Sequence, residues 1–476
     1  MGKLKKILIQ TLGSRGDIQP FVAVALGLQR SGYEVLVAAS ENHCSMLTEY
    51  GVRCASVFSD YEEIMRSDPT MLKATSTGSI MSFVKALNQT FQKDGGSIVA
   101  KWLKEVEVFG PDLVVVGGTL TCYFGLVAQL LLDVPFIQLN LVCCNPCPKR
   151  MHFGLPNLPL GLNTQLMKLL GADARKGWKP FDPMIKEKFG AGILEQYSGL
   201  DAYEDWLGKP GFPVFSAVPR SIFSVLYPDS PPEVNIIGPL VMDRELQASV
   251  NATSFGSSGT LATLSKFIAA GSCPVYMGWG SMICQSPEYM VVLAMKALRH
   301  SGKRAIVLAG AARLSLELLE ASTEDKSLIE HTRANTLFVA SAPHEWLFPQ
   351  VSCIVHHGGA GTTAAALRSG VPQVITPVWI DQFDHARCMN ELGIGVGFEK
   401  MSKQFHKIRA KELGEAIRRA SSDPGIAEKA KALGKQARVE DGVAAFVQAL
   451  PKYWQNRVET GRLATFFKER AQKRKR

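Results

Sequence analysis

Residues 6–40 decide the fold of this chain, and they read KILIQTLGSRGDIQPFVAVALGLQRSGYEVLVAAS. KILIQT is an apolar run of strand length, and EVLVAA at 34–39 is a second one. Between them PFVAVALGLQRSG predicts a helix that is opened by Pro20 and closed by Gly32. The stretch therefore predicts a right-handed strand–helix–strand unit with parallel strands.

Asp17 lies in the turn GSRGDIQP, at the carboxyl end of the first predicted strand. Ligands bind at this end of parallel strands. An Asp before a first helical turn also caps free backbone N–H groups, and the turn residues taken alone favour such a cap. A dinucleotide site is not indicated, because GSRGD lacks the third glycine of the G-x-G-x-x-G fingerprint.

The composition is that of a folded globular protein with two domains, since 476 residues are 46% hydrophobic and 20% charged. The ten cysteines have no metal-ligand spacing, and Cys143, Cys144 and Cys147 of CCNPC have no partner cluster. We interpret them as reduced thiols of a cytoplasmic protein. No run approaches the roughly 20 apolar residues that a membrane span needs.

A net charge of +10 suggests an anionic partner or surface, and the tail FFKERAQKRKR concentrates part of it. The tail is equally well interpreted as a solvated helix end or as a peripheral contact with a membrane. Basic patches interleaved with aromatic residues are absent, so no nucleic acid partner is expected.

Two successive α/β patterns organise the chain. The first covers 1–240, and a segment rich in Pro, Trp and Lys at 151–207 has the character of an inserted substrate wall. A small, polar stretch at 241–272 is interpreted as a linker. The second pattern covers 273–450. Residues 451–476 predict a helix, whose apolar side chains could cover the first domain, and a basic tail.

The second half contains CIVHHGGAGTTAAALRSG at 353–370, in which an apolar strand leads through glycines into a helix. Bare backbone N–H groups at such a helix N-terminus hold a diphosphate without a metal. His356 could add a hydrogen bond or a proton. The two histidines do not predict a metal site, because no carboxylate or Cys lies at a suitable spacing beside them.

These motifs resemble a known family. APHEWLFPQVSCIVHHGGAGTTAAALRSGVPQVITPVWIDQFDHARCMNELGIGV at 342–396 is similar to the donor region of UDP-sugar-dependent GT-B glycosyltransferases, and GSRGDIQPFVAVALGLQRSGYEV to their N-terminal signature. With YMGWGSM, the resemblance is closest to the sterol glucosyltransferase branch and the related bacterial antibiotic glycosyltransferases. It implies two Rossmann-like parallel-sheet domains that face each other across a cleft, with a C-terminal helix returning to the N-terminal domain.

The resemblance also implies roles for individual residues. Asp17 matches the general base that acts on the acceptor hydroxyl. The diphosphate would meet Ser281 and His356, and the uracil would be read between Ser341 and His344. The sugar hydroxyls would bond Asp381 and Gln382. The residues implied at the donor are Ser14, Arg15, Gly16, Ser281, Ser341, Ala342, Pro343, His344, His356, Gly358, Gly359, Ala360, Gly361, Thr362, Asp381 and Gln382.

The chain departs from plant small-molecule glycosyltransferases, which have a histidine base and a glutamate on the ribose. Here those positions hold Asp17 and Ala364, so the ribose contact is unassigned. The resemblance implies an inverting, metal-independent transfer of glucose from UDP-glucose, with no cofactor. Apolar residues such as Phe153, Leu155, Leu158 and Leu160 would either line a wall for a hydrophobic alcohol or belong to the core.

Three rival interpretations remain. The acceptor could be a polyketide, macrolide or triterpenoid instead of a sterol. A GT-B sugar-nucleotide epimerase would use similar phosphate contacts, but GSRGD argues against it. A non-catalytic lipid- or nucleotide-sugar-binding protein is disfavoured, because Asp17, Asp381 and Gln382 are all present.

Overall fold

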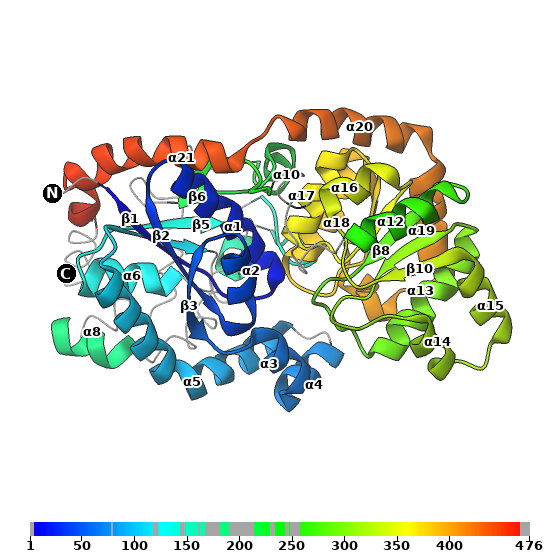
Figure 1. The fold of residues 1–476 in the computed structure, drawn as a ribbon, viewed down its shortest axis with the longest axis horizontal. Coiled ribbons are helices and arrows are strands. Elements are labelled where there is room, and N and C mark those ends of the chain that lie inside the picture. The colour runs from blue at the N-terminus through cyan, green and yellow to red at the C-terminus, as the bar shows by residue number, and fades with distance from the viewer. Residues whose placement is uncertain are drawn as a thin grey trace.

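The computed structural model consists of two parallel-sheet domains that lie side by side (Figure 1). It describes residues 4–77, 80–117, 122–142, 147, 149–159, 162–166, 181–189, 214–228, 234–242, 247 and 258–466. The α/β class predicted from the sequence is confirmed.

The N-terminal sheet has the strand order β3-β2-β1-β4-β5-β6-β7, and every described pairing in it is parallel. Its apolar strands are buried on both faces, as a helix-covered parallel sheet requires. The strands are β1 (Lys6–Gln10), β2 (Glu34–Ser40), β3 (Arg53–Phe58), β4 (Leu113–Gly117), β5 (Phe136–Asn140), β6 (Val214–Ser216) and β7 (Asn235–Ile236).

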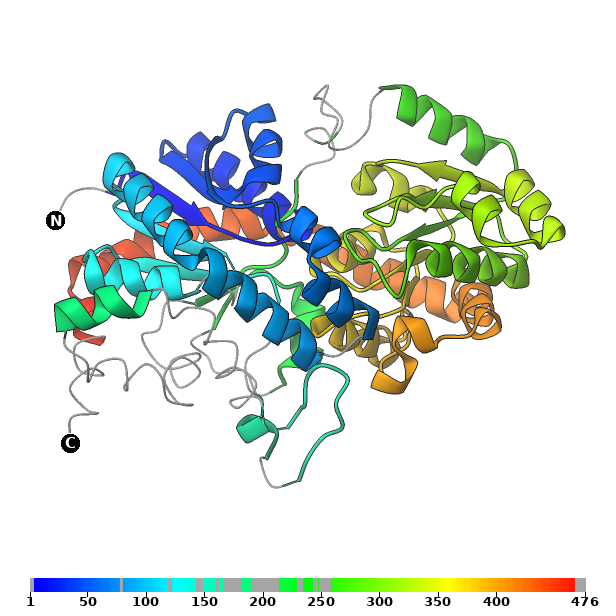
Figure 2. The same ribbon diagram turned by 90° about the horizontal axis from the view of Figure 1, so that it is seen from below.

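Helices on both faces of this sheet supply its packing partners (Figure 2). They are α1 (Arg15–Arg30), α2 (Cys44–Glu49), α3 (Tyr61–Ser67), α4 (Pro69–Thr77), α5 (Ile80–Phe109), α6 (Cys122–Leu131) and α8 (Asp182–Phe189). Helix α10 (Arg220–Leu226) instead packs against α18 (Asp381–Leu392) and α20 (Pro424–Arg438) of the C-terminal domain.

The C-terminal sheet has the order β10-β9-β8-β11-β12-β13, again parallel throughout. Its strands are β8 (Val275–Gly278), β9 (Ala305–Leu308), β10 (Thr336–Val339), β11 (Ile354–His356), β12 (Gln373–Ile375) and β13 (Gly395–Gly397). Its helices are α12 (Ser258–Ala269), α13 (Pro287–Ser301), α14 (Leu316–Ser322), α15 (Lys326–Asn335), α16 (His344–Leu347), α17 (Ala360–Ser369), α18 (Asp381–Leu392), α19 (Ala410–Ser422) and α20 (Pro424–Arg438).

Each sheet reverses its strand order beside its first strand. The reversal lies between β1 and β4 in one sheet and between β8 and β11 in the other. A crevice forms at the carboxyl ends of the strands where the order reverses. The turn after β1, which holds Asp17, and the turns after β8 and β11 therefore lie at the two ligand-binding positions of the fold.

The chain returns to the N-terminal domain at its end, as predicted. Helix α21 (Gly442–Tyr453) packs on α1, and Phe446 lies in the N-terminal core (Figure 1). The hydroxyl of Tyr453 donates to the carbonyl of Phe136 at 2.9 Å. A π-helix at Trp454–Glu459 continues the contact, with Trp454 and Val458 buried in the same core.

The predicted linker contains a helix, α12, at Ser258–Ala269. Leu264 of α12 is fully buried against Tyr276 and Ile306 of the C-terminal sheet. The sequence interpretation missed this helix although Leu261, Leu264 and Ile268 recur at helical spacing, because the small, polar residues that precede them were interpreted as a linker.

Candidate functional site

The Asp17 turn is built by a reciprocal pair of hydrogen bonds. Ser14 is the N-cap of α1, and the Asp17 backbone N–H donates to the Ser14 carbonyl at 2.8 Å. The Asp17 Oδ2 accepts from the Ser14 N–H at 2.8 Å and from the Ser14 Oγ at 3.0 Å. Asp17 therefore does cap the helix, but from its third position and not from the N-cap.

The expectation that Pro20 opens this helix is wrong. α1 begins at Arg15, so Pro20 lies inside the helix. The hydrogen bonds between Ser14 and Asp17 satisfy free N–H groups in a first turn that starts before Pro20. Together they stabilise the helix more than the loss of the one backbone hydrogen bond at Pro20 destabilises it. The spacing of Ser14 and Asp17 was the sequence signal for this start. Gly32, with φ of +86°, follows the end of the helix as predicted.

Gly13 fixes where the Asp17 carboxylate lies. Its φ of +135° is in a region that favours glycine. A Cβ at this position would overlap the Asp17 Oδ2. The turn therefore needs glycine for two independent reasons.

The pKa of Asp17 is shifted by its surroundings. Burial raises the pKa of Asp17 to about 6, although the hydrogen bonds from Ser14 lower it, and the negative charge of Asp381 also raises it. Asp381 belongs to the C-terminal domain, so its charge acts on Asp17 across the interface. No described residue hydrogen-bonds the second oxygen, Oδ1, of Asp17.

The predicted diphosphate site lies where β11 leads into α17. Gly359 is the N-cap, so the N–H groups of Ala360, Gly361 and Thr362 have no partner within the helix. Gly358 has φ of +96°, and a Cβ there would press on Ile375 and the Gln382 backbone. A Cβ at Gly361 would meet nothing within 4 Å, which leaves open space at the helix end.

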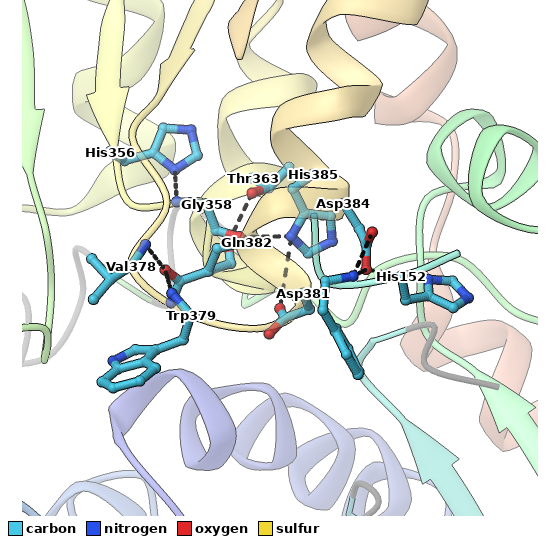
Figure 3. Close-up of polar contacts among 12 residues, drawn as sticks. His152, His356, Gly358, Thr363, Val378, Trp379, Asp381, Gln382, Asp384 and His385 are labelled. Carbon is cyan, nitrogen blue, oxygen red and sulfur yellow. Dashed lines mark hydrogen bonds and ion pairs between the residues drawn. The ribbon is translucent and has the colours of Figure 1, made fainter. Parts of the chain in front are cut away.

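His356 has protein partners on both ring nitrogens. Its Nδ1 accepts from the Gly358 N–H at 3.1 Å (Figure 3). Its Nε2 lies 2.9 Å from the Gln373 Oε1. Burial lowers its pKa to about 3, so the ring is neutral. The side chain is thus occupied in shaping the turn, and this arrangement leaves it no nitrogen for a phosphate.

His357 is the residue that the sequence analysis missed. No described residue hydrogen-bonds either of its ring nitrogens, and its Nδ1 is buried. Its Nε2 lies so near the N-cap of α17 that a Cβ at Gly359 would overlap it. Burial lowers the pKa of His357 to about 4. An imidazole without partners at a helix N-terminus is suited to bonding an anion.

Ser281 follows Gly280, the residue of the turn after β8 that lies against His357. The turn after β8 is closed by the Met282 N–H, which donates to the Trp279 carbonyl at 3.0 Å. Gly280 in this turn has φ of +57°, and a Cβ there would lie 3.3 Å from the His357 Cε1. The partly exposed Ser281 is therefore next to the expected diphosphate position.

Asp381 and Gln382 begin α18, below the same turn (Figure 3). The Asp381 carboxylate lies 3.8 Å from the His385 Nδ1, which also donates to the Gly358 carbonyl at 2.6 Å. Burial raises the pKa of Asp381. The Gln382 Oε1 accepts from the Val378 and Trp379 N–H groups at 2.7 and 2.9 Å, so only its amide N–H₂ can face a ligand.

The segment Ser341–His344 lies against Tyr276. The Tyr276 hydroxyl is 3.1 Å from the His344 Nε2, and the His344 ring stacks on Phe348 at 4.4 Å between centroids. Burial lowers the pKa of His344 to about 3, and the positive charge of Arg15 also lowers it. Arg15 of the Asp17 turn therefore acts on this segment electrostatically. Ala342 is buried, and Gly16 is exposed.

Phe153 of the expected acceptor wall is mostly buried. It packs with Met151, Leu155, Leu166 and Ile380 in a small cluster between the domains. The core interpretation therefore holds for Phe153 and Leu155. Leu160 lies outside the described residues.

The cysteine prediction is wrong at two positions, because Cys44 and Cys54 form a disulfide. The two residues are adjacent because α2, which begins at Cys44, packs against β3, which holds Cys54, and their spacing did not reveal this contact. Cys147, Cys273, Cys284 and Cys353 have free thiols, and Cys143 and Cys144 lie outside the described residues.

Among the residues that the structure describes, no three His, Cys, Asp or Glu side chains are grouped as metal ligands would be. Within the same ranges, no helix has the length and apolar character needed to cross a membrane.

Both halves of the chain match family models. Residues 7–137 match the glycosyltransferase family 28 N-terminal domain, and residues 305–450 match the erythromycin biosynthesis protein CIII-like C-terminal domain. The sterol 3-beta-glucosyltransferase of Komagataella phaffii is 24% identical over 473 residues, which are 95% of this chain and 36% of that protein. The chain thus spans about a third of that relative.

Solved structures share the fold. The glycosyltransferase of kitacinnamycin has a TM-score of 0.64 at 17% identity, over 95% of this chain and 99% of that one. The glycosyltransferase VinC, solved in complex with dTDP, has a TM-score of 0.59 at 17% identity, over 94% of this chain and 98% of that one. The chain belongs to the GT-B glycosyltransferases.

Proposed function

We propose that the chain is an inverting glycosyltransferase that moves glucose from UDP-glucose to a hydroxyl of a hydrophobic acceptor, with a sterol as the first choice. One observation carries the proposal. The negative charge of Asp381, on the donor-side helix, raises the pKa of Asp17, in the acceptor-side turn, across the domain interface. A base and a sugar-binding group in that relation are what a direct transfer requires.

The proposed step is a single displacement. The acceptor hydroxyl gives its proton to the Asp17 Oδ1, its oxygen bonds the anomeric carbon, and the bond from that carbon to the diphosphate oxygen breaks. Attack opposite to the departing UDP inverts the anomer. An Asp whose pKa is about 6 is a stronger base than an exposed one and is still ionised at pH 7.

The N-terminus of α17, Ser281 and His357 would hold the negative charge that develops on the diphosphate. We propose that no metal is needed for this. Transfer should then persist in EDTA, whereas loss of transfer in EDTA with recovery on adding Mg²⁺ or Mn²⁺ would contradict the proposal.

The acceptor proposal rests on the relative named a sterol 3-beta-glucosyltransferase, which the chain matches over 95% of its own length. A natural-product acceptor with a dTDP-sugar is the second candidate, because VinC was solved with dTDP. Release of UDP or dTDP should be measured with both donors against sterols, triterpenoids, polyketides and macrolides. Activity confined to a dTDP-sugar and a macrolide would replace the first proposal with the second.

We also propose that the basic tail brings the protein to anionic membranes, where sterols reside. The stretch that leads into this tail carries further positive charges at Arg457 and Arg462, which follow the buried Trp454. Sedimentation with phosphatidylserine vesicles should decrease as salt rises. No binding at low salt would leave the tail as a solvated helix end.

A further inference from the structure

An interdomain contact lies one turn along α18 from Asp381. Segment 149–159, which follows β5 in the N-terminal domain, lies on this helix (Figure 3). The His152 Nδ1 is 3.2 Å from the Asp384 Oδ2. The Phe153 N–H donates to both Asp384 oxygens, at 3.1 and 3.2 Å.

Neither side chain of this pair reaches solvent. His152 has 0% and Asp384 has 1% of its side chain exposed. A buried carboxylate costs free energy unless it is hydrogen-bonded, so Asp384 strongly favours the position in which segment 149–159 is docked. The His152 ring also stacks on Tyr227, with centroids 6.0 Å apart.

Further contacts follow the same face of the helix. The Arg387 Nη1 donates to the Met151 carbonyl at 2.9 Å, and the Arg150 Nη1 is 2.5 Å from the Glu391 Oε1. Residues 384, 387 and 391 are spaced by three and four, so they share one side of α18. Gly154, with φ of +69°, lets the chain pass against the Phe383 ring.

Asp381 begins this helix, and the segment comes from the domain that holds Asp17. We propose that His152 and Asp384 are a positioning pair: by docking segment 149–159 on α18, they hold Asp381 in register with Asp17, so that donor sugar and acceptor base meet. The inference rests on the proposed function. The nucleotide contacts lie elsewhere, on α17 and Ser341–His344.

Two substitutions of His152 separate positioning from packing. His152→Phe keeps the ring that stacks on Tyr227 but removes the donor to Asp384. His152→Asn restores an N–H near the Nδ1 position. Arg150→Gln is the matched control, because it removes a partly exposed ion pair between the same two segments.

We expect His152→Phe to lower kcat for transfer about tenfold while the Kd for UDP changes less than about twofold. His152→Asn should recover most of kcat, and Arg150→Gln should stay within about twofold of wild type. Equal kcat for His152→Phe and wild type would overturn the proposal. So would a parallel loss of UDP affinity and Tm, or no rescue by His152→Asn.

Hydrogen exchange tests the docking of this segment without a measurement of activity. The Phe153 amide and the amides of α18 should exchange about tenfold faster in His152→Phe than in wild type or in His152→Asn. If the wild-type protein transfers no sugar, the proposed function fails. Hydrogen exchange alone then tests whether the His152–Asp384 pair docks segment 149–159 on α18. Unchanged exchange in His152→Phe would then overturn the inference.

Discussion

The two oxygens of Asp17 have different surroundings, and this decides what the residue can do. Oδ2 is held by Ser14, while Oδ1 has no hydrogen-bond partner among the described residues. The cap and the base are therefore compatible roles of one carboxylate. Sequence reasoning located Asp17 and Asp381, because both follow strand ends in a recognisable motif. It assigned the phosphate contact to His356 and not to His357, because the partner that occupies His356 is Gln373 on the neighbouring strand, which no local pattern reveals.

The raised pKa of Asp17 predicts an acid limb in the rate. Only the ionised carboxylate accepts a proton, so kcat/KM should fall about tenfold per pH unit below pH 6. The pH dependence of stability has the opposite direction to that of the rate. Because the folded pKa is raised, the contribution of Asp17 to stability is full below about pH 4 and is lost as pH rises through about 6. A rate profile between pH 4.5 and 8 checks the first statement, and a flat profile would contradict it.

The two histidines should differ in what their loss affects. His357→Asn should lower transfer by about 10²–10³ with little change in Tm, because it removes a group near the developing charge. His356→Ala should lower Tm, since Gly358 and Gln373 lose a buried partner. Steady-state kinetics and thermal melts of both variants check this. A large loss of transfer in His356→Ala together with a lower Tm only in His357→Asn would instead assign the phosphate contact to His356.

At the scale of elements, the strand–helix–strand unit and the glycine-rich turn between β11 and α17 were predictable from local pattern. The start of α1 depended on a Ser–Asp pair that overrides a proline, and α12 on apolar contacts with the C-terminal sheet. The disulfide depended on the packing of α2 against β3. The Ser14–Asp17 signal is local, whereas the disulfide and the packing of α12 involve partners outside the window that a sequence pattern covers.

The disulfide predicts sensitivity to reductants. Cys44 and Cys54 are 10 residues apart, and closing a loop of that size stabilises a fold by about 2–3 kcal/mol. The N-terminal domain should therefore unfold at lower denaturant in dithiothreitol. The Cys44→Ala/Cys54→Ala variant should already show that loss and respond no further. Two free thiols at these positions in the purified oxidised protein would contradict the pairing.

At the scale of the whole molecule, the doubled α/β architecture and the returning C-terminal helix were predicted. The apolar cluster between the domains was not. It joins Ile222, Phe223 and Tyr227 to Ala386 and Met389 of α18, and no local pattern identifies such a contact. The cluster and the His152–Asp384 pair together fix how the two crevices face each other.

The C-terminal return should contribute to the stability of the N-terminal domain. Truncation after residue 450 removes Trp454, Val458 and Leu463 from its core, each worth about 1.5–3 kcal/mol. The truncated protein should therefore melt several degrees lower, whereas truncation after residue 466 should not change the melt. Equal melting of the two truncated forms would show that the return adds no stability.

The most direct test of the account is sugar transfer by Asp17→Asn. The Asn side-chain oxygen can accept both Ser14 bonds, so Tm should not fall, and UDP affinity should stay unchanged because the expected nucleotide contacts are in the other domain. Since an amide cannot take the proton, turnover should drop by roughly 10²–10⁴. A variant that transfers glucose at nearly the wild-type rate would contradict the assignment of Asp17 as the base.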